Sequence, residues 1–528
     1  MASITDLNSA SGSQPQVACD VCVVGAGAAG LYIAGRLARH GVAVTVVEAG
    51  GSICGSGQSA GIEAIFSASD YRGAVEGRAF GWGGSTSRWG GLLVPHSELD
   101  IRNDAGQQSA VWTHVVGVVR ERSSAVFSTL GLSSSPDFFS FPEAALGPIA
   151  TLLREQGLAT IASEFLPLTR RNLTYLASGP ARERVQVFLN AVVSKWFVRA
   201  RHPSGEVSTI EATSLGGACL RVAAKCFVVA AGAIESARIL LEIDRATQGR
   251  MLPRGAAVGR YLSDHLSCPV ADVHADDRQR AAAVFAPVFA NGRMRSFRFV
   301  DTSVGPEAPR HFAHLVFDGA NPGVRLAKDV LSGLQGRYLP KVTLTSARTG
   351  LSGLIGLAYG RFVRSRLFIP QGTSSKLQLD IEQLPAVDNR VHLGDETDRL
   401  GRPVAIIHWR IGDADYSGID LLSQRFMASW PAAALGVRLV RIHADAASPK
   451  PYDAYHPVGT CRMGDDAEAT VDLDLRVRGT QNVFVLSTGV LPSAGTANPT
   501  FSMLCLGDKL AETLTSFARV PLNAQVVA

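Results

Sequence analysis

One stretch near the start of the chain, residues 19–50, constrains the fold more than any other. It begins as a short apolar strand at 20–24 and then reaches three glycines spaced G-x-G-x-x-G, which are Gly25, Gly27 and Gly30. A helical pattern with one small, apolar face follows, and a β-branched strand at 42–47 then runs into Glu48. This order of strand, glycines, helix, strand and acid predicts a βαβ unit that binds a dinucleotide.

Each glycine has a separate role in such a unit. Gly25 permits the tight turn out of the strand, Gly27 lets the backbone approach a pyrophosphate, and Gly30 allows the helix to pack closely on the sheet. The N–H groups and the positive end of the helix dipole then receive the phosphates. Glu48 lies roughly 20 residues past the glycines, where an acid binds a ribose hydroxyl. An ordinary glycine-rich crossover is the alternative, and the motif alone does not separate FAD from NAD.

The length and composition indicate a globular protein. At 528 residues, the chain is long enough for two domains, one of which we expect to be discontinuous. Hydrophobic residues make up 46% and charged residues 18%, which is typical of soluble proteins. The net charge of +5 is spread along the chain and gives no reason to expect nucleic-acid binding. The sequence has no run of about 18 or more apolar residues, which argues against a membrane span.

The N-terminus and the cysteines bear on the compartment. Residues 1–17 are polar and show neither a secretory signal pattern nor twin arginines, so we expect a flexible leader and a cytoplasmic protein. The cysteines are scattered, as thiols in cytosolic enzymes are: Cys19, Cys22, Cys54, Cys219, Cys226, Cys268, Cys461 and Cys505. Cys19 and Cys22 form a C-x-x-C without a second pair at metal-ligand spacing. Core packing is therefore favoured over redox or zinc chemistry, and no metal site is predicted.

A second glycine-rich segment follows at 80–91, FGWGGSTSRWGG. So many glycines cost backbone entropy on ordering, and the usual reason is close approach of the backbone to a ligand. The alternative is a surface loop, which the two tryptophans make less favourable. We therefore interpret this segment as part of a binding site.

The middle of the chain carries weaker patterns. Helical patterns cover 111–130 and 149–156, and a β-rich pattern at 185–196 continues into a hairpin. A buried strand at 226–231 meets Gly232 and a further helix, which repeats the strand-to-helix entry of a nucleotide-binding fold.

Residues 270–442 shift to alternating strands, interrupted by a basic amphipathic helix at 351–366. The arginines of that helix indicate a solvated face, the rim of a substrate pocket or contact with a membrane surface. Residues 377–393 predict two strands joined by a turn, suited to the floor of a substrate domain. Glu382 and Gln383 lie on or beside the first of these strands, and they are candidates for binding substrate hydroxyls or an ammonium group.

Two further segments near the C-terminus are dense in motifs. Residues 455–464 read YHPVGTCRMG, and residues 483–510 read as a strand, a Gly-Pro loop and a helix that begins after Pro499. A helix N-terminus of this kind is a natural anion site.

Together these segments resemble the glucose–methanol–choline (GMC) family of FAD oxidoreductases. The motif GGSTSRWGG resembles the family's flavin-contacting loop, and NAVVS resembles its adenine-contacting hairpin. VVAAGAIESARILL and VGRYLSDH match further signatures, and HPVGTCRMG and LPSAGTANPT match the segments that carry the catalytic pair. The resemblance selects FAD over NAD.

The resemblance also implies an α/β fold with two domains. A Rossmann-like FAD-binding domain is expected at 18–100, 185–265 and 450–523. A discontinuous substrate-binding domain, built on a mostly antiparallel sheet with helices, is expected at 101–184 and 266–449.

The family's cofactor contacts carry over by position. The residues implied are Gly25, Gly27, Ala28, Ala29, Gly30, Glu48, Ala49, Gly84, Ser85, Arg88, Trp89, Gly90, Gly91, Val193, Ala231, Gly232, Gly489, Asn498, Pro499 and Thr500. Pyranose oxidases attach the flavin through a histidine of the glycine-rich loop, and Arg88 stands at that position here, so non-covalent FAD is implied. Many members have an acid where this chain reads Ser487-Thr488-Gly489, so we expect the flavin contacts there to differ in detail.

The catalytic pair implied by the resemblance is His456 and Asn498. A base for alcohol oxidation must be neutral at working pH and within hydrogen-bond reach of the hydroxyl, and histidine, with a pKa of about 6.5, meets both needs. Asparagine can hold an alkoxide oxygen but cannot take a proton, which leaves His456 as the single base. Outside such a motif a histidine is more often a packed turn residue, and for His265, in another signature, we expect a structural role.

The most similar branch of the family is the sugar-oxidising one, with pyranose oxidases and bacterial enzymes. The sequence therefore predicts an FAD-dependent oxidoreductase that converts a hydroxyl of a sugar, amino sugar or glycoside to a carbonyl, with hydride passing to flavin N5. The alternatives are an alcohol or sterol oxidoreductase with an apolar substrate, an FAD-containing lyase without net oxidation, and a flavin-containing subunit without activity. No motif distinguishes oxygen from another electron acceptor.

Overall fold

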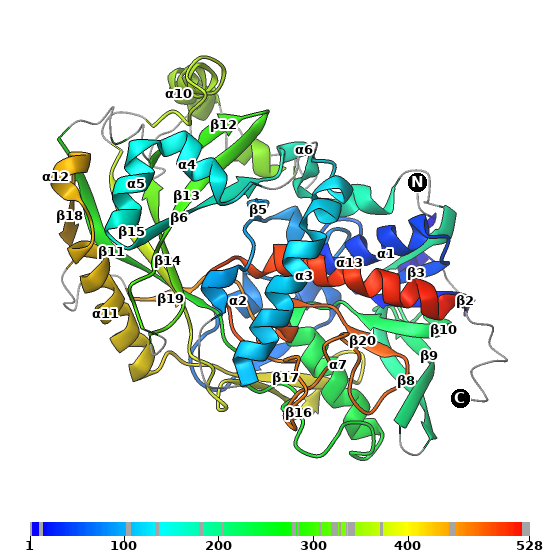
Figure 1. Cartoon of the computed structure of the whole chain (residues 1–528). Coiled ribbons are helices and arrows are strands. Elements are labelled where there is room, and N and C mark those ends of the chain that lie inside the picture. Colours follow the sequence, from blue (N-terminus) through cyan, green and yellow to red (C-terminus); the bar gives the residue numbers. More distant parts are fainter. Residues whose placement is uncertain are drawn as a thin grey trace.

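The computed structural model shows two large sheets, one in each half of the molecule (Figure 1). It describes residues 3–9, 14–101, 107–132, 137–178, 183–201, 204–276, 281, 285–305, 308–317, 326, 329–333, 335, 344–369, 373–442 and 450–519. The predicted fold class, a Rossmann-like domain joined to a mostly antiparallel one, is confirmed.

The first sheet has the strand order β1-β7-β3-β2-β10-β9-β8, and β20 pairs with β10. Its strands are β1 (Ser3–Asp6), β2 (Gln16–Val24), β3 (Val44–Val47), β7 (Val185–Leu189), β8 (Val192–Arg201), β9 (Ser204–Thr213), β10 (Cys219–Val229) and β20 (Val483–Val485). The pairs from β1 to β10 and the pair β10–β20 are parallel, whereas β9 is antiparallel to both of its neighbours, β8 and β10. Strands β3, β7 and β20 and the C-terminal ends of β2 and β10 consist mostly of buried valine and other apolar residues, because both faces of a parallel sheet are covered.

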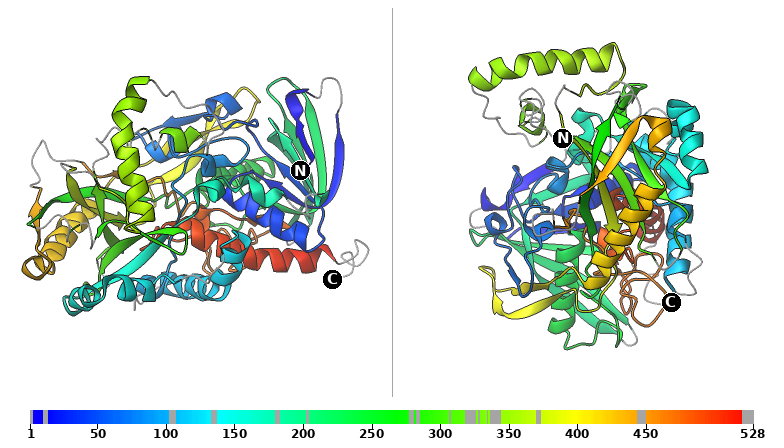
Figure 2. Two further views of the ribbon diagram at one scale, coloured as in Figure 1. Left: turned by 90° about the horizontal axis from the view of Figure 1, so that it is seen from above. Right: turned by 90° about the vertical axis from the view of Figure 1, so that its left-hand side faces the viewer.

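Four long helices pack around this sheet. They are α1 (Ala28–Arg39), α3 (Gln107–Thr129), α7 (Gly232–Ala246) and α13 (Pro499–Ala518). The C-terminal α13 packs against both α1 and α3, so segments from opposite ends of the chain lie side by side (Figures 1 and 2). Helix α13 is apolar on most of its surface, as expected for a helix covered on several sides.

The second sheet is antiparallel, with the order β18-β11-β15-β14-β13-β6-β5, extended by β12 on β13 and β19 on β11. Its strands are β5 (Leu92–Leu93), β6 (Leu158–Phe165), β11 (His265–Ala275), β12 (Val288–Ala290), β13 (Arg293–Asp301), β14 (His311–Phe317), β15 (Ser375–Glu382), β18 (Val437–Arg441) and β19 (Tyr452–Asp453). Helices α4 (Ser140–Leu146), α5 (Pro148–Glu155), α11 (Asp413–Ala428) and α12 (Ala432–Leu435) lie around it (Figure 1).

A third, small sheet joins distant parts of the chain. Strand β16 (Arg390–Thr397) pairs with β17 (Pro403–His408), which pairs in parallel with β4 (Ala64–Phe66). The two strands predicted within residues 377–393 both form, as β15 and β16. They belong to different sheets, however, because β15 pairs with β11 and β14, whereas β16 takes β17 as its partner.

The N-terminal segment differs from the expectation of a flexible leader. Strand β1 pairs with β7 in parallel, from Ser3 opposite Gln186 to Asp6 opposite Leu189. Leu7, at the end of this strand, is fully buried in the core. An apolar anchor and a free sheet edge thus fix residues 3–9 in place.

The remaining elements are short or peripheral. They are α2 (Arg72–Val75), α6 (Leu168–Arg171), α10 (Leu344–Phe362) and the 3-10 turns Leu7–Ser9, Gln58–Ala60, Gly84–Ser87, Glu98–Asp100, Leu173–Ala177 and Thr488–Val490. Helix α10, which corresponds to the predicted basic helix, stands at one edge of the molecule (Figure 2). Among the described residues, no helix is both long and apolar enough to cross a membrane.

Candidate active site

The first glycine-rich turn leaves an open cradle at the start of α1. A Cβ atom on Gly25 would lie 2.6 Å from the carbonyl oxygen of Ala230, and one on Gly30 would lie 1.9 Å from that of Gly25. A Cβ atom on Gly27, in contrast, would meet nothing within 4 Å. Two of the glycines therefore permit tight packing, while the third faces open space at a helix N-terminus.

The N–H groups at this helix end are available to a ligand. Gly27 is the N-cap of α1, and no side chain caps the helix, whose first turn begins with Ala28 and Ala29. The first N–H groups of a helix have no partner within the helix, and a phosphate can accept from them.

Glu48 fastens the surrounding loops together. Its Oε2 accepts a hydrogen bond from the N–H of Ala26 at 2.7 Å, and its Oε1 accepts from those of Gly50 (2.9 Å) and Gly81 (2.8 Å). Burial raises the pKa of this carboxyl, and the N–H donors act in the opposite direction. The acid thus has a structural role that its position after the second strand did not predict, since both oxygens already serve the protein backbone.

The second glycine-rich segment packs directly on the first. The N–H of Gly83 donates to the carbonyl oxygen of Ala26 at 3.1 Å, and a Cβ atom on Gly84 would lie 2.8 Å from Cα of Gly27. Ser85, in the same 3-10 turn, donates to the carbonyl of Gly77. The structure therefore brings the two segments together, although more than 50 residues separate them.

The end of this segment faces outward and carries the residue at the flavin-attachment position. The Trp89 indole donates to the carbonyl of Arg171 at 2.7 Å, and the exposed Arg88 donates to that of Cys54 at 3.2 Å. Gly90 has open space where a Cβ atom would be, whereas Gly91 adopts a positive φ of 70° against the Arg171 side chain.

A third backbone approach comes from the start of α7. Ala231 is the N-cap of this helix, and Gly232 has a φ of +76° with nothing within 4 Å of its Cβ position. Gly489 lies beside them, since its Cβ atom would be 3.1 Å from Cα of Ala233. Val193, on β8, is buried, and Ala49 directly follows Glu48.

These features fit a bound dinucleotide. Helices α1, α7 and α13 each begin without a side-chain cap, the last at Asn498, Pro499 and Thr500. Gly27, Gly90 and Gly232 each have open space where a side chain would otherwise stand. The described residues include no cluster of His, Cys, Asp and Glu suited to a metal ion.

The two predicted catalytic residues touch each other. Nε2 of His456 lies 2.9 Å from Nδ2 of Asn498, and Nδ1 of His456 lies 3.0 Å from Nδ1 of His265. The second nitrogen of His265 lies 2.9 Å from the carbonyl oxygen of Gly495. The site is thus a hydrogen-bonded series of four groups, in the order Gly495, His265, His456 and Asn498.

This hydrogen-bonded series determines which nitrogen of His456 carries the proton. A carbonyl only accepts, so Nε2 of His265 carries a hydrogen, and Nδ1 of a neutral His265 is an acceptor. Nδ1 of His456 must then be the donor between the two rings, which leaves the lone pair of His456 on Nε2. Burial lowers the pKa of His265 to about 4 and also lowers that of His456, so both rings are neutral near pH 7.

Arg298 orients Asn498, the last group of the hydrogen-bonded series. Its guanidinium donates to Oδ1 of Asn498, and since arginine only donates, the amide oxygen must face it. The amide nitrogen therefore faces His456 and donates to the Nε2 lone pair. The Gly495 carbonyl can only accept and the Arg298 guanidinium can only donate, and these two contacts independently require the same tautomer of His456.

The backbone around His456 is held by Asp264. This buried carboxyl group accepts from the N–H of His456 (2.8 and 3.0 Å), from that of His265 (2.7 Å) and from the Tyr71 hydroxyl (2.5 Å). Burial raises the pKa of Asp264 to about 8, and these donors oppose the shift. His265 therefore has both the structural role that we expected and a direct contact with the predicted base.

The predicted substrate contacts of Glu382 and Gln383 are not what the structure shows. Glu382 accepts from the backbone N–H of Arg310 (2.9 Å), its guanidinium (3.0 Å) and the Ser493 hydroxyl (2.6 Å). Gln383 accepts from the Trp409 indole and donates to the carbonyl of Arg410, both at 2.8 Å. Both side chains are buried and join strands and loops, because the end of β15 lies in the core rather than at a pocket wall.

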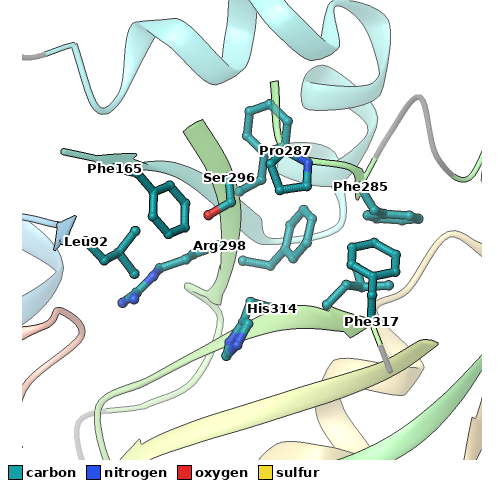
Figure 3. A pocket seen from close by; sticks show the side chains of 11 residues that line it. Leu92, Phe165, Phe285, Pro287, Ser296, Arg298, His314 and Phe317 are labelled. Carbon is teal, nitrogen blue, oxygen red and sulfur yellow. The ribbon is translucent and has the colours of Figure 1, made fainter. Parts of the chain in front are cut away.

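Sequence reasoning missed Arg298 and the pocket beside it. A cavity of about 190 Å³ is lined by Leu92, Phe165, Phe285, Pro287, Ser296, Phe297, Arg298, Phe299, His314, Leu315 and Phe317 (Figure 3). These residues come from five separate segments and carry no motif. The one sequence signal is the presence of three arginines, Arg293, Arg295 and Arg298, in a strand whose other residues are mostly apolar.

Comparisons with known proteins agree with this geometry. Residues 385–507 match a family model described as GMC oxidoreductase, and residues 23–86 match one described as an NAD(P)-binding Rossmann-like domain. The chain is 24% identical to the paromamine 6'-oxidase of Streptomyces fradiae over 92% of this chain and 89% of that protein. It is 26% identical to the C-glycoside 3-oxidase of Arthrobacter globiformis over 84% of this chain and 74% of that protein.

Among solved structures, the pyridoxine 4-oxidase from Mesorbium loti superimposes with a TM-score of 0.56. The match covers 94% of this chain and 99% of that one at 16% identity, and at that identity it supports the fold alone.

Proposed function

This chain belongs to the GMC oxidoreductase family, whose members act on CH–OH groups with FAD, and we propose that it oxidises a hydroxyl of a sugar, amino sugar or glycoside to a carbonyl. The observation that carries the proposal is the His456–Asn498 pair, with the lone pair of His456 directed to Asn498. The paromamine and C-glycoside oxidases, which align over more than four-fifths of the chain, support the substrate class.

The chemistry follows from the orientation of the two side chains. A bound FAD would supply the acceptor for the hydride of the carbinol carbon. The substrate hydroxyl takes its place between the catalytic residues, donating to Nε2 of His456 and accepting from Nδ2 of Asn498. His456 then takes the hydroxyl proton, and Asn498 holds the oxygen as it becomes a carbonyl. His265 holds the His456 ring in the tautomer that it needs in order to accept this proton.

The depressed pKa of His456 gives a pH prediction. A histidine whose pKa is lowered stays neutral, and therefore able to accept a proton, below the usual value of about 6.5. We expect the rate of flavin reduction at saturating substrate to stay level as the pH falls from about 8 to about 5.5. Stopped-flow absorbance under anaerobic conditions measures it. A decline centred near the ordinary histidine pKa would contradict this assignment.

A second prediction concerns how the flavin is held. The backbone cradles at α1, α7 and α13 would hold the phosphates, and Arg88 cannot form the covalent link made by histidine. We therefore expect acid precipitation to release all FAD into the supernatant, in the parent protein and in Arg88→Ala alike. Flavin that remained with the precipitated parent polypeptide would show a covalent bond.

The experiment that tests the proposed function is anaerobic bleaching of the bound flavin by candidate substrates. The panel contains sugars, amino sugars, glycosides and sterols, and bleaching by the polar members alone is the expected result. Bleaching by sterols alone would favour an apolar substrate. No bleaching with FAD present would favour the lyase or the inactive subunit. Air admitted after bleaching then separates an oxidase from a dehydrogenase.

A further inference from the structure

The cavity beside the catalytic pair has an apolar body and one charged edge. Phe285 and Phe317 lie on one side in Figure 3, and Arg298 points to the opposite side. Phe165 and Leu92 close the cavity near Arg298. Because Arg298 also donates to Asn498, the cavity lies next to the position where the reacting hydroxyl would bind.

The size and lining of the cavity suit a single aromatic ring. Its volume is about 190 Å³, and eight of its eleven lining residues are phenylalanine, leucine or proline. An apolar cavity of about 150 Å³ in another protein stays dry and binds benzene. A hydrated sugar ring would instead leave its hydroxyls facing phenylalanine side chains without hydrogen-bond partners, which costs free energy.

Arg298 is a buried cation with a spare donor. The residue is 5% exposed, and its Nη1 has no hydrogen-bond partner in the part of the chain that the structure describes. The acid whose charge acts on it, Asp380, pairs with His314 at 3.1 Å and accepts from Ser267 instead. Burial lowers the pKa of Arg298 to about 10, so the side chain is still charged at neutral pH.

The two terminal nitrogens of the Arg298 guanidinium, Nη1 and Nη2, differ in their hydrogen bonds. Nη2 orients Asn498, so the free Nη1 lies one guanidinium width from the catalytic amide. This spacing suits an oxygen on the carbon next to the one that is oxidised, as in a vicinal sugar hydroxyl. A protonated amine at the same place would meet a fixed positive charge in a site shielded from water, which is unfavourable.

We propose that the substrate is an aryl glycoside, with the aromatic aglycone in the phenylalanine-lined cavity and a neutral sugar held by Arg298 at the oxygen beside the reacting carbinol. The inference rests on the proposed function and narrows it, because it excludes amino sugars and simple alkyl glycosides as preferred substrates. The class is identified by three features together: the apolar cavity, its one-ring volume and the unpaired donor at its edge.

The test compares matched glycosides on the holoenzyme. Phenyl and methyl glycosides of glucose, galactose and xylose, together with glucosamine, are assayed by anaerobic flavin reduction. Calorimetry on the dithionite-reduced holoenzyme, which cannot oxidise them, measures binding separately. For whichever sugar is oxidised, we expect the phenyl glycoside to exceed the methyl glycoside by about 10- to 100-fold in kcat/KM and in affinity.

Ser296→Leu fills the cavity without touching the catalytic pair. We expect it to bring the phenyl-to-methyl ratio of kcat/KM near one, because the leucine side chain takes up the space that the phenyl group would occupy. Phe139→Leu alters an exposed phenylalanine that does not line the cavity, and it should leave the ratio unchanged. An unchanged ratio in Ser296→Leu would place the aryl group elsewhere and overturn the proposal.

The charge of Arg298 is tested by selectivity rather than rate. Arg298→Met lowers all rates because Asn498 loses its partner. It should also raise the ratio of kcat/KM for glucosamine to kcat/KM for glucose by at least about tenfold, whereas Arg298→Lys should leave this ratio unchanged. Equal use of methyl and phenyl glycosides, or a preference for glucosamine, in the parent protein overturns the inference while the proposed function stands. Absence of bleaching by every sugar defeats the proposed function itself.

Discussion

His456→Ala is expected to lower the rate of flavin reduction by about 10²-fold or more, the scale of a lost general base. The lone pair of Nε2 is the one acceptor that the chain of contacts directs at the amide of Asn498, and asparagine cannot replace it as a base near neutral pH. Anaerobic stopped-flow reduction, with the flavin content of each preparation checked first by absorbance, measures the effect.

The matched control is His40→Ala. This histidine is exposed at the end of α1, away from the site, so its loss should leave flavin reduction unchanged. Reduction of His456→Ala at a rate close to that of the parent would show that another group takes the proton. Since His265 is the neighbour of His456, the double variant with His265→Ala would then identify it or exclude it.

The parts of the fold that were predicted correctly are those encoded by local patterns. The turn between β2 and α1 requires glycines at fixed spacing, because a Cβ atom on Gly25 or Gly30 would clash with the backbone. At Gly232, between β10 and α7, the reason is a different one: its φ of +76° is a backbone conformation that favours glycine. The carbonyl that a Cβ atom on Gly25 would meet belongs to the distant Ala230, but the spacing of the glycines is itself local, so the sequence pattern carries it.

Features that depend on distant partners were not predictable in this way. Strand β1 was expected to be a flexible leader, but it pairs with β7, which lies about 180 residues later. Glu382 and Gln383 were interpreted as substrate ligands because they are polar residues beside a strand. Only the packing of β15 beside Arg310 and Trp409 shows that they serve the core.

In the catalytic site, too, the residues within local motifs were predicted and those brought in by tertiary packing were not. The motifs around His456 and Asn498 predicted the pair, and the structure brings the two side chains into contact. Arg298, which orients Asn498, and Asp264, which holds the backbone of His456, reach the site through tertiary packing. Arg298 in particular lies on β13, and its role depends on a strand pairing that no local pattern specifies.

Glu48→Ala is expected to cause loss of FAD together with a large loss of stability. The carboxylate accepts three backbone hydrogen bonds, from Ala26, Gly50 and Gly81, and these tie the phosphate turn to the second glycine-rich segment. A buried N–H left without a partner costs about 1–3 kcal/mol, so removal of the acceptor should cost at least about 3 kcal/mol of the free energy of unfolding. The cradle at Gly27 would lose its shape along with that stability.

A graded series separates the hydrogen bonds from the bulk of the side chain. In Glu48→Gln, the amide oxygen can still accept from Gly50 and Gly81, but its NH₂ group faces the N–H of Ala26, donor against donor. FAD content after gel filtration and the melting temperature should therefore fall in the order parent, Gln, Ala. Glu76→Ala, which removes an exposed acid, should match the parent in both. Full FAD retention and an unchanged melting temperature in Glu48→Ala would mean that the loops hold the cofactor without this acid, and that their glycines alone set the shape of the cradle.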